Sequence, residues 1–161
     1  MWTLVTEFNP NSKLNDHIEV GDDLVFPNIQ SCVGVFADLG TELVGVHLTV
    51  GDKNKKDGYD QVVQKFLAKC KGQKPTEIFA IGAVTNEWHQ QLRKFGVPVK
   101  YFSTQPGKKL DPHNVDKSFY IDLRVTKQSG NIKFAMQPAS ADPNHPNNAF
   151  QPVDAAMLHL L

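Results

Sequence analysis

Hydrophobic residues recur along the chain with two different periods, and these periods predict the secondary structure. Strict alternation of apolar and polar residues, or a short continuous apolar run, indicates a β-strand. Spacing of three and four residues indicates an amphipathic helix. The strand-like runs, in chain order, are 2–8, 29–36, 43–50, 77–84, 97–102, 119–125 and 132–136. Helical spacing falls on 59–70 and 86–95.

The runs 29–36 and 43–50 carry the candidate chemistry. Asp38-Leu39-Gly40-Thr41 separates them, which is typical of a β-hairpin. A turn centred on Leu39-Gly40 places opposed side chains on one face of the hairpin, because side chains alternate along a strand. The pairs predicted for this face are Phe36 with Leu43, Gly34 with Gly45, Cys32 with His47, and Gln30 with Thr49.

A cysteine opposite a histidine is a candidate nucleophile and base. A free thiol has a pKa of about 8.5, and an adjacent imidazolium favours the thiolate. The histidine can then act as general acid and general base. The glycine pair beside them carries no side chains and is expected to leave room for a ligand. The alternative is a core cysteine near an ordinary strand histidine.

The segments Ile29-Gln30-Ser31-Cys32-Val33-Gly34-Val35 and Gly45-Val46-His47-Leu48 resemble the catalytic segments of bacterial protein-glutamine deamidases. The chemoreceptor glutamine deamidases have a Leu-Gly-Ser-Cys-Val run before a Gly-rich strand that bears the histidine. The Cys-to-His spacing is closer to that of the catalytic domains of cytotoxic necrotising factors. The order of elements from about residue 20 to 137 is also similar.

The resemblance implies a nucleophilic Cys32 with His47 as its acid and base. Two positions differ from the pattern: Gln30 stands in place of the glycine before Ser-Cys, and Phe26 stands where the chemotaxis enzymes have a threonine. In some toxin relatives a backbone carbonyl orients the histidine instead. Gln30 and Thr49 are candidates for orienting His47 or supplying an oxyanion donor, as are backbone N–H groups near Cys32. Ser31, Gly34 and Gly45 are candidates for substrate access.

Composition limits the other classes of function. The chain has 161 residues, of which 40% are hydrophobic and 21% charged, with 17 basic and 17 acidic side chains. This zero net charge argues against nucleic acid as a partner. No apolar run approaches a membrane span of about 18 residues, so membrane insertion is not expected. No metal-spacing cluster, phosphate loop or signal peptide is evident. We therefore expect synthesis in the cytosol, no metal and no cofactor, with signal-independent export left open.

Several other segments have simpler interpretations. Asp22 and Asp23 are expected to be turn residues, with a carboxylate partner for His47 or a cation site as the alternative. Cys70 falls on the apolar stripe of the helix 59–70 and is expected to be core. The Pro- and Asn-rich segment 138–152 is expected to be an extended tether. It leads to a short C-terminal helix, 155–161, capped by Asp154.

These observations together predict one α+β domain, 1–161, with mixed or antiparallel sheets in a sandwich-like arrangement flanked by helices, as in the deamidase toxins. The leading hypothesis is a monomeric protein-glutamine deamidase that forms a thioester on Cys32, with a delivered effector or toxin favoured over a chemotaxis enzyme. Its partner would be a protein bearing a reactive glutamine. The alternatives are a Cys–His thiol protease or transglutaminase-like acyltransferase, and a binding module without chemistry.

Overall fold

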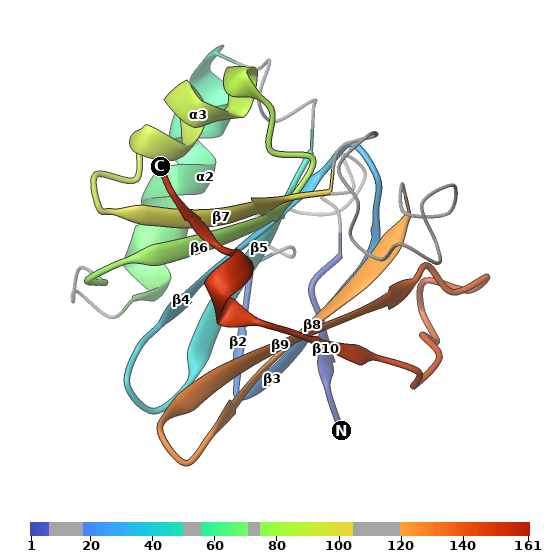
Figure 1. Cartoon of the computed structure of the whole chain (residues 1–161). Coiled ribbons are helices and arrows are strands. Elements are labelled where there is room, and N and C mark those ends of the chain that lie inside the picture. The colour runs from blue at the N-terminus through green and yellow to red at the C-terminus, as the bar shows by residue number, and fades with distance from the viewer. Residues whose placement is uncertain (7–17, 50–55, 71–74, 105–119) are drawn as a thin grey trace.

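The computed structural model describes residues 1–6, 18–49, 56–70, 75–104 and 120–161. The described strands form two sheets of mostly antiparallel strands (Figure 1). The five-stranded sheet has the order β1 (Thr3–Leu4), β3 (Asp23–Ile29), β8 (Ile121–Gln128), β9 (Asn131–Pro138), β10 (Gln151–Val153). The six-stranded sheet has the order β11 (His159–Leu160), β7 (Val99–Ser103), β6 (Ile78–Gly82), β4 (Val33–Asp38), β5 (Leu43–Leu48), β2 (Ile18–Gly21). The helices among the described residues are α2 (Lys56–Lys69), α3 (Asn86–Arg93) and the 3-10 turn η2 (Ala155–Met157).

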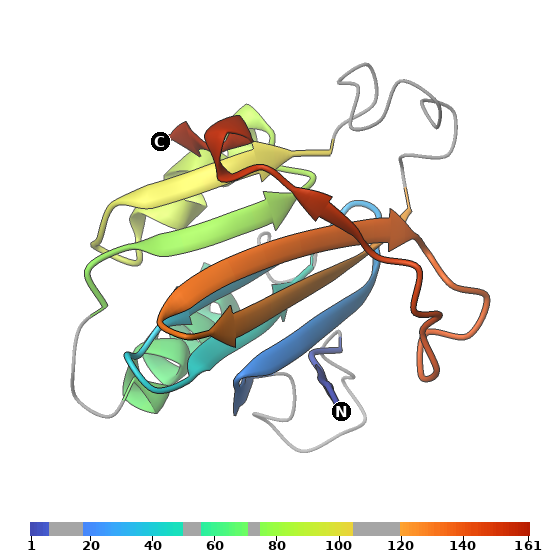
Figure 2. The same cartoon turned by 60° about the horizontal axis from the view of Figure 1, so that its bottom comes forward.

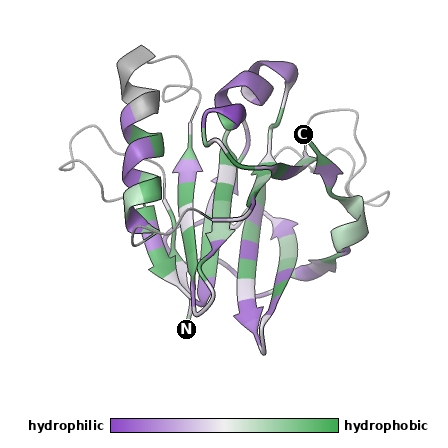
Figure 3. Cartoon of the chain, turned by 90° about the vertical axis from the view of Figure 1, so that its left-hand side faces the viewer, coloured by the Kyte–Doolittle hydropathy of each residue, from purple (hydrophilic) through white to green (hydrophobic). Residues whose placement is uncertain are grey.

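Two hydrophobic cores hold these layers together. The inner core lies between the two sheets and contains a cluster of aromatic rings, in which Phe36 stacks on Phe79 with ring centroids 5.2 Å apart. The outer core lies between the six-stranded sheet and the helices and includes Phe66 of α2 and Trp88 of α3. Figure 2 shows the sheets and helices as successive layers. The strands at the centre of the molecule are mainly hydrophobic, whereas the helices carry hydrophilic bands (Figure 3).

The alternation of side chains along β4 and β5 divides them between these cores. Val33, Val35 and Val46 face the helices, and Phe36 and Leu43 face the other sheet. Both faces of these strands are therefore covered, which explains why their sequences are almost continuously apolar. The predicted α+β class with two largely antiparallel sheets is confirmed at this level.

The predicted strand 29–36 is wrong at its beginning. β3 ends at Ile29 in the five-stranded sheet, and β4 begins at Val33 in the six-stranded sheet. Residues 30–32 thus carry the chain from one sheet to the other, and Cys32 is the last residue of this crossing. The short strand β2 was also missed, because only Ile18 of its four residues is buried.

The C-terminal segment packs on the body of the protein, contrary to the expectation of an extended tether. The carboxylate of Asp122, which is fully buried, accepts hydrogen bonds from Ser140 N, Ser140 Oγ and Gln137 Nε2. Gln137 in turn binds the backbone of Asn147 and Ala149. The predicted helix 155–161 is only the turn η2, followed by β11. Its predicted cap is confirmed, since Asp154 accepts a hydrogen bond from Ala156 N.

Candidate functional site

The hairpin of β4 and β5 forms as predicted, but its register differs from the expectation by two residues. His47 lies opposite Gly34, and Phe36 lies opposite Gly45. The chain reverses at Gly40-Thr41 and not at Leu39-Gly40, since Leu39 N donates to the carbonyl of Glu42 at 2.9 Å. Within this turn the Asp38 carboxylate accepts a hydrogen bond from Gly40 N at 2.8 Å. The prediction that Cys32 lies directly opposite His47 is wrong. A displacement of two residues preserves the face of every side chain within the ladder, but Cys32 lies directly before β4 and outside the paired residues.

Cys32 and His47 lie near the same end of the six-stranded sheet. Cys32 directly precedes β4, two residues before Gly34, which is the partner of His47. The carbonyl of Cys32 accepts a hydrogen bond from Ala83 N at 2.9 Å, which ties the residue to the end of β6. Both side chains are buried, with exposed fractions of 5% for Cys32 and 0% for His47.

A backbone carbonyl orients the imidazole of His47. Nδ1 lies 3.1 Å from the carbonyl oxygen of Val5. A carbonyl only accepts hydrogen bonds, so Nδ1 carries the proton and Nε2 is the basic nitrogen of the neutral ring. Val5 is itself fixed to β3, since its N–H donates to the carbonyl of Val25 at 2.8 Å. Sequence reasoning did not identify Val5, because a main-chain acceptor has no residue signature.

The glycines near His47 do not form the open space that the sequence suggested. Gly34 and Gly45 are not paired with each other, and the ring of Phe26 from β3 covers both. A Cβ atom at Gly34 would lie 3.0 Å from Phe26 Cδ1, and one at Gly45 would lie 2.7 Å from Phe26 Cζ. An aromatic ring from the other sheet thus fills the space that the absent side chains leave. The prediction of substrate space at these glycines is wrong.

The remaining predicted site residues lie around the crossing from β3 to β4 and beyond the end of β5. Gln30 and Ser31 are exposed in the crossing, directly before Cys32. Thr49 follows β5 and is half-buried. The predicted pairing of Gln30 with Thr49 lies outside the paired residues of β4 and β5. Ser31 remains a candidate for substrate access, because it is the exposed residue next to the thiol.

Asp23 is not the carboxylate partner of His47. Its carboxylate forms a bidentate ion pair with the Arg124 guanidinium, at 3.0 and 2.7 Å, and this hydrogen bonding raises the pKa of Arg124. Asp22 is exposed between β2 and β3, as expected for a turn residue.

Cys70 is a core residue, as predicted. It is 2% exposed in the outer core, and its thiol donates to the carbonyl of Phe66 at 3.4 Å. Burial raises the pKa of the Cys70 thiol, so this cysteine is an inert reference for any measurement on Cys32.

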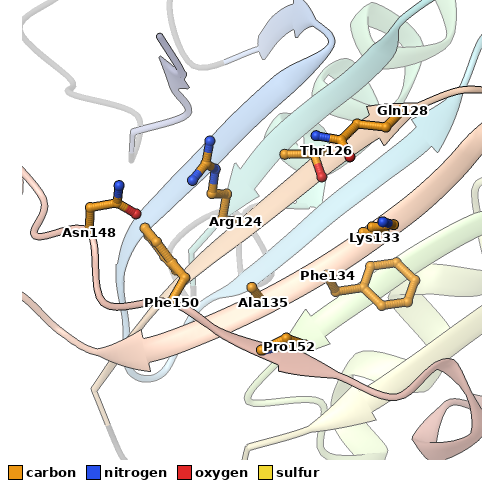
Figure 4. A pocket seen from close by; sticks show the side chains of 9 residues that line it. All are labelled: Arg124, Thr126, Gln128, Lys133, Phe134, Ala135, Asn148, Phe150 and Pro152. Carbon is orange, nitrogen blue, oxygen red and sulfur yellow. The ribbon is translucent and has the colours of Figure 1, made fainter.

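A separate hollow lies on the outer face of the five-stranded sheet (Figure 4). Its volume is about 260 Å³. The Arg124 guanidinium beside it lies 5.0 Å from the ring centroid of Trp2 and 5.8 Å from that of Phe150. Arg124 alternates along β8 with Leu123 and Val125, which face the inner core. The hollow therefore opens on the side of this sheet that faces away from the inner core.

Comparisons with known proteins do not assign this arrangement to a family. No family model matches the chain, and no curated protein matches it. Within the described residues, no group of three or more His, Cys, Asp or Glu side chains could hold a metal ion. The described helices are too short or too polar to cross a membrane.

Proposed function

We propose that this protein is a protein-glutamine deamidase with Cys32 as nucleophile and His47 as general acid and base, on a fold of the deamidase-toxin type. The observation that supports the proposal is that Cys32, directly before β4, lies near the same end of the sheet as His47, whose Nδ1 is oriented by the Val5 carbonyl. A basic Nε2 close to a thiol would activate a cysteine nucleophile.

In the proposed reaction, Cys32 forms the covalent bond and His47 transfers the protons. Nε2 of His47 accepts the proton of the Cys32 thiol, and the thiolate attacks the carbon of the carboxamide. Nε2 returns the proton to the amide nitrogen as the tetrahedral intermediate collapses. Ammonia departs, and a thioester remains on Cys32. Nε2 then accepts a proton from water as the water attacks the thioester. That proton returns to sulfur, and the products are glutamate and the free enzyme.

The burial of Cys32 supports a side-chain amide over a main-chain amide as substrate. Only 5% of Cys32 is exposed, next to the exposed residues Gln30 and Ser31. The long, unbranched side chain of glutamine is narrow enough to reach a recessed sulfur. A main-chain peptide bond continues as polypeptide on both sides, so an enzyme that cleaves it needs an open groove around the nucleophile. This consideration favours deamidation over proteolysis.

The test combines a thiol measurement with an activity measurement. In a Cys70→Ala background, the rate of Cys32 alkylation is measured against pH, and we expect a midpoint well below 8 that rises when His47 is replaced by alanine. Ammonia release is measured with glutamine-containing peptides and proteins, and we expect Cys32→Ser and His47→Ala to abolish it while Cys70→Ala retains it. Mass spectrometry of the acceptor separates Gln-to-Glu conversion from cleavage or cross-linking. Full activity of Cys32→Ser would refute the mechanism.

The close packing around His47 favours a second candidate, a binding module without chemistry. His47 is fully buried, and Phe26 closes the space beside the glycines, as in an ordinary core. This candidate predicts that Cys32 of the folded protein is not alkylated until the protein unfolds. The same pH series therefore separates the two functions.

A further inference from the structure

Two adjacent buried hydroxyls at the end of β7 have no hydrogen-bond partner among the described residues. Ser103 is 3% exposed and Thr104 is 2% exposed. Neither Ser103 Oγ nor Thr104 Oγ1 makes a hydrogen bond there. Buried hydroxyl groups are nearly always paired in folded proteins. Each of these two therefore requires an explanation, such as a ligand that is bound during function.

Main-chain hydrogen bonds bring Thr104 to the same end of the sheet as Cys32. Thr104 N donates to the carbonyl of Gly82 at 2.7 Å, and Ala83 N donates to the carbonyl of Cys32 at 2.9 Å. The start of β4, the end of β6 and the end of β7 thus lie side by side. Because neighbouring strands are about 4.8 Å apart, the main chains at Cys32 and Thr104 are separated by about 10 Å.

Alternation along β7 places the two hydroxyls on different faces. Tyr101 packs against the outer core and Phe102 belongs to the inner core. Ser103 therefore lies on the helix side of the sheet, and Thr104 lies on the inner side. His47 alternates with Val46 and Leu48 of the outer core, so the imidazole lies on this inner side as well. Cys32 directly precedes Val33 of the outer core, and continued alternation before β4 would place its sulfur on the same side.

The end of β6 packs closely against Cys32. Gly82 has φ +145°, and a Cβ atom there would lie 2.4 Å from the carbonyl oxygen of Cys32, so the glycine allows the two backbones to approach. Ala83, the next residue, donates its N–H to that carbonyl and carries only a methyl group. In addition, β6 and β7 are parallel, and the carboxyl ends of parallel strands are common ligand sites. A substrate group that reaches this end of the sheet would therefore meet Cys32 and Thr104 with only a methyl side chain between them.

We infer that the Thr104 hydroxyl donates a hydrogen bond to the carbonyl oxygen of the glutamine carboxamide during attack by Cys32. This inference rests on the proposed deamidase function. Sulfur attacks from about 3–3.5 Å, and the hydroxyl binds the oxygen at about 2.8 Å. Together with the side chains of Cys32 and Thr104, these two contact lengths span the separation of about 10 Å between the main chains of the two residues. As negative charge develops on the oxygen, the hydrogen bond strengthens, and the hydroxyl acts as an oxyanion donor.

The experiment compares Thr104→Val, which keeps the shape but removes the hydroxyl, with Ser103→Ala as a matched control on the other face. We expect Thr104→Val to reduce kcat/KM for ammonia release by about 100-fold or more and Ser103→Ala to change it less than about twofold. Removing an unpaired buried hydroxyl without changing its shape should leave Tm unchanged or raise it by a few degrees. Thr104→Ser retains a hydroxyl and should keep most of the activity.

A second measurement does not depend on turnover. Methyl methanethiosulfonate has no carboxamide, so its rate of reaction with Cys32 should be the same in Thr104→Val and in the wild type. Iodoacetamide carries a carboxamide, and its rate relative to the first reagent should fall in Thr104→Val. Both rates are measured in the Cys70→Ala background.

The outcomes separate this inference from the proposed function. Unchanged activity of Thr104→Val, in an enzyme that Cys32→Ser inactivates, would overturn the role of Thr104 alone. A parallel loss of Tm and activity would overturn it as well, because the hydroxyl would then have a structural role. A wild type that releases no ammonia and alkylates Cys32 only on unfolding would overturn the deamidase proposal, and this inference with it.

Discussion

Replacing Gly45 by alanine tests how tightly the inner core is packed beside the candidate site. The new Cβ would lie 2.7 Å from Phe26 Cζ and 3.0 Å from Leu24 Cδ1. Both neighbours have exposed fractions of 0%, so neither can swing into solvent. Overpacking of this kind costs about 1–3 kcal/mol, whereas the lower entropy of the unfolded alanine chain offsets about 0.4–1 kcal/mol. We expect a net loss of about 1–2 kcal/mol in the free energy of unfolding.

A matched control and a second substitution identify the ring as the cause. Gly21→Ala makes the same chemical change in β2, where the Cβ would meet its nearest neighbours at 3.5 and 3.6 Å, which is ordinary contact. We expect this control to be neutral or slightly stabilising. Phe26→Leu shortens the side chain opposite Gly45. It should destabilise the wild type through a cavity but relieve part of the penalty of Gly45→Ala, with a coupling energy of at least about 0.5 kcal/mol.

Urea unfolding measures these differences, and the fluorescence of Trp88, which is 1% exposed in the outer core, reports the transition. A change in midpoint at constant slope indicates a change in stability. If Gly45→Ala were as stable as Gly21→Ala, or if the two substitutions at the contact were strictly additive, the ring would not occupy the space beside Gly45. The expectation of a substrate opening at that position would then become tenable again.

Two further predictions concern other buried groups. Asp122→Asn places an amide where Asn28 N, Gln137 Nε2 and Ser140 now donate. It should lower the free energy of unfolding by about 2–3 kcal/mol and accelerate proteolysis within residues 139–149; unchanged cleavage would refute this role. Burial raises the pKa of the Cys70 thiol, so the folded state retains the thiol proton at pH values where the unfolded chain loses it. Stability should therefore fall as pH rises above about 9, and Cys70→Ala should lose less Tm between pH 8 and 10.

The elements that the sequence predicted well are those whose apolar residues repeat with a clear period. Helix α2 buries Val62, Val63 and Phe66 as its stripe requires. The alternating apolar residues of the runs 119–125 and 132–136 that the structure describes lie in β8 and β9, which join at Ser129-Gly130, where both residues have positive φ, 50° and 81°. In these segments local pattern and tertiary packing agree, so the pattern alone was sufficient.

The features that were missed depend on contacts between distant segments. The hairpin register follows from where the chain reverses, at Gly40-Thr41, with Leu39 N bonded to Glu42 O and Gly40 N bonded to the Asp38 side chain, and hydrophobic alternation does not encode this position. The fold of residues 139–149 depends on the buried carboxylate of Asp122, far away in β8. Phe26 fills the space beside Gly34 and Gly45 from the other sheet. None of these contacts has a signature within the segment that it organises.

Burial determines how Cys32 and His47 can act together. Nδ1 of His47 faces the neutral carbonyl of Val5, and a single charge formed on a fully buried imidazole or thiol is strongly disfavoured. Proton transfer from sulfur to Nε2 instead creates a pair with zero net charge, which burial penalises much less than an isolated ion. The two residues should therefore ionise only as a unit. Loss of His47 would leave Cys32 a neutral thiol, which is why the pH profile of Cys32 alkylation in His47→Ala is more informative than the loss of activity alone.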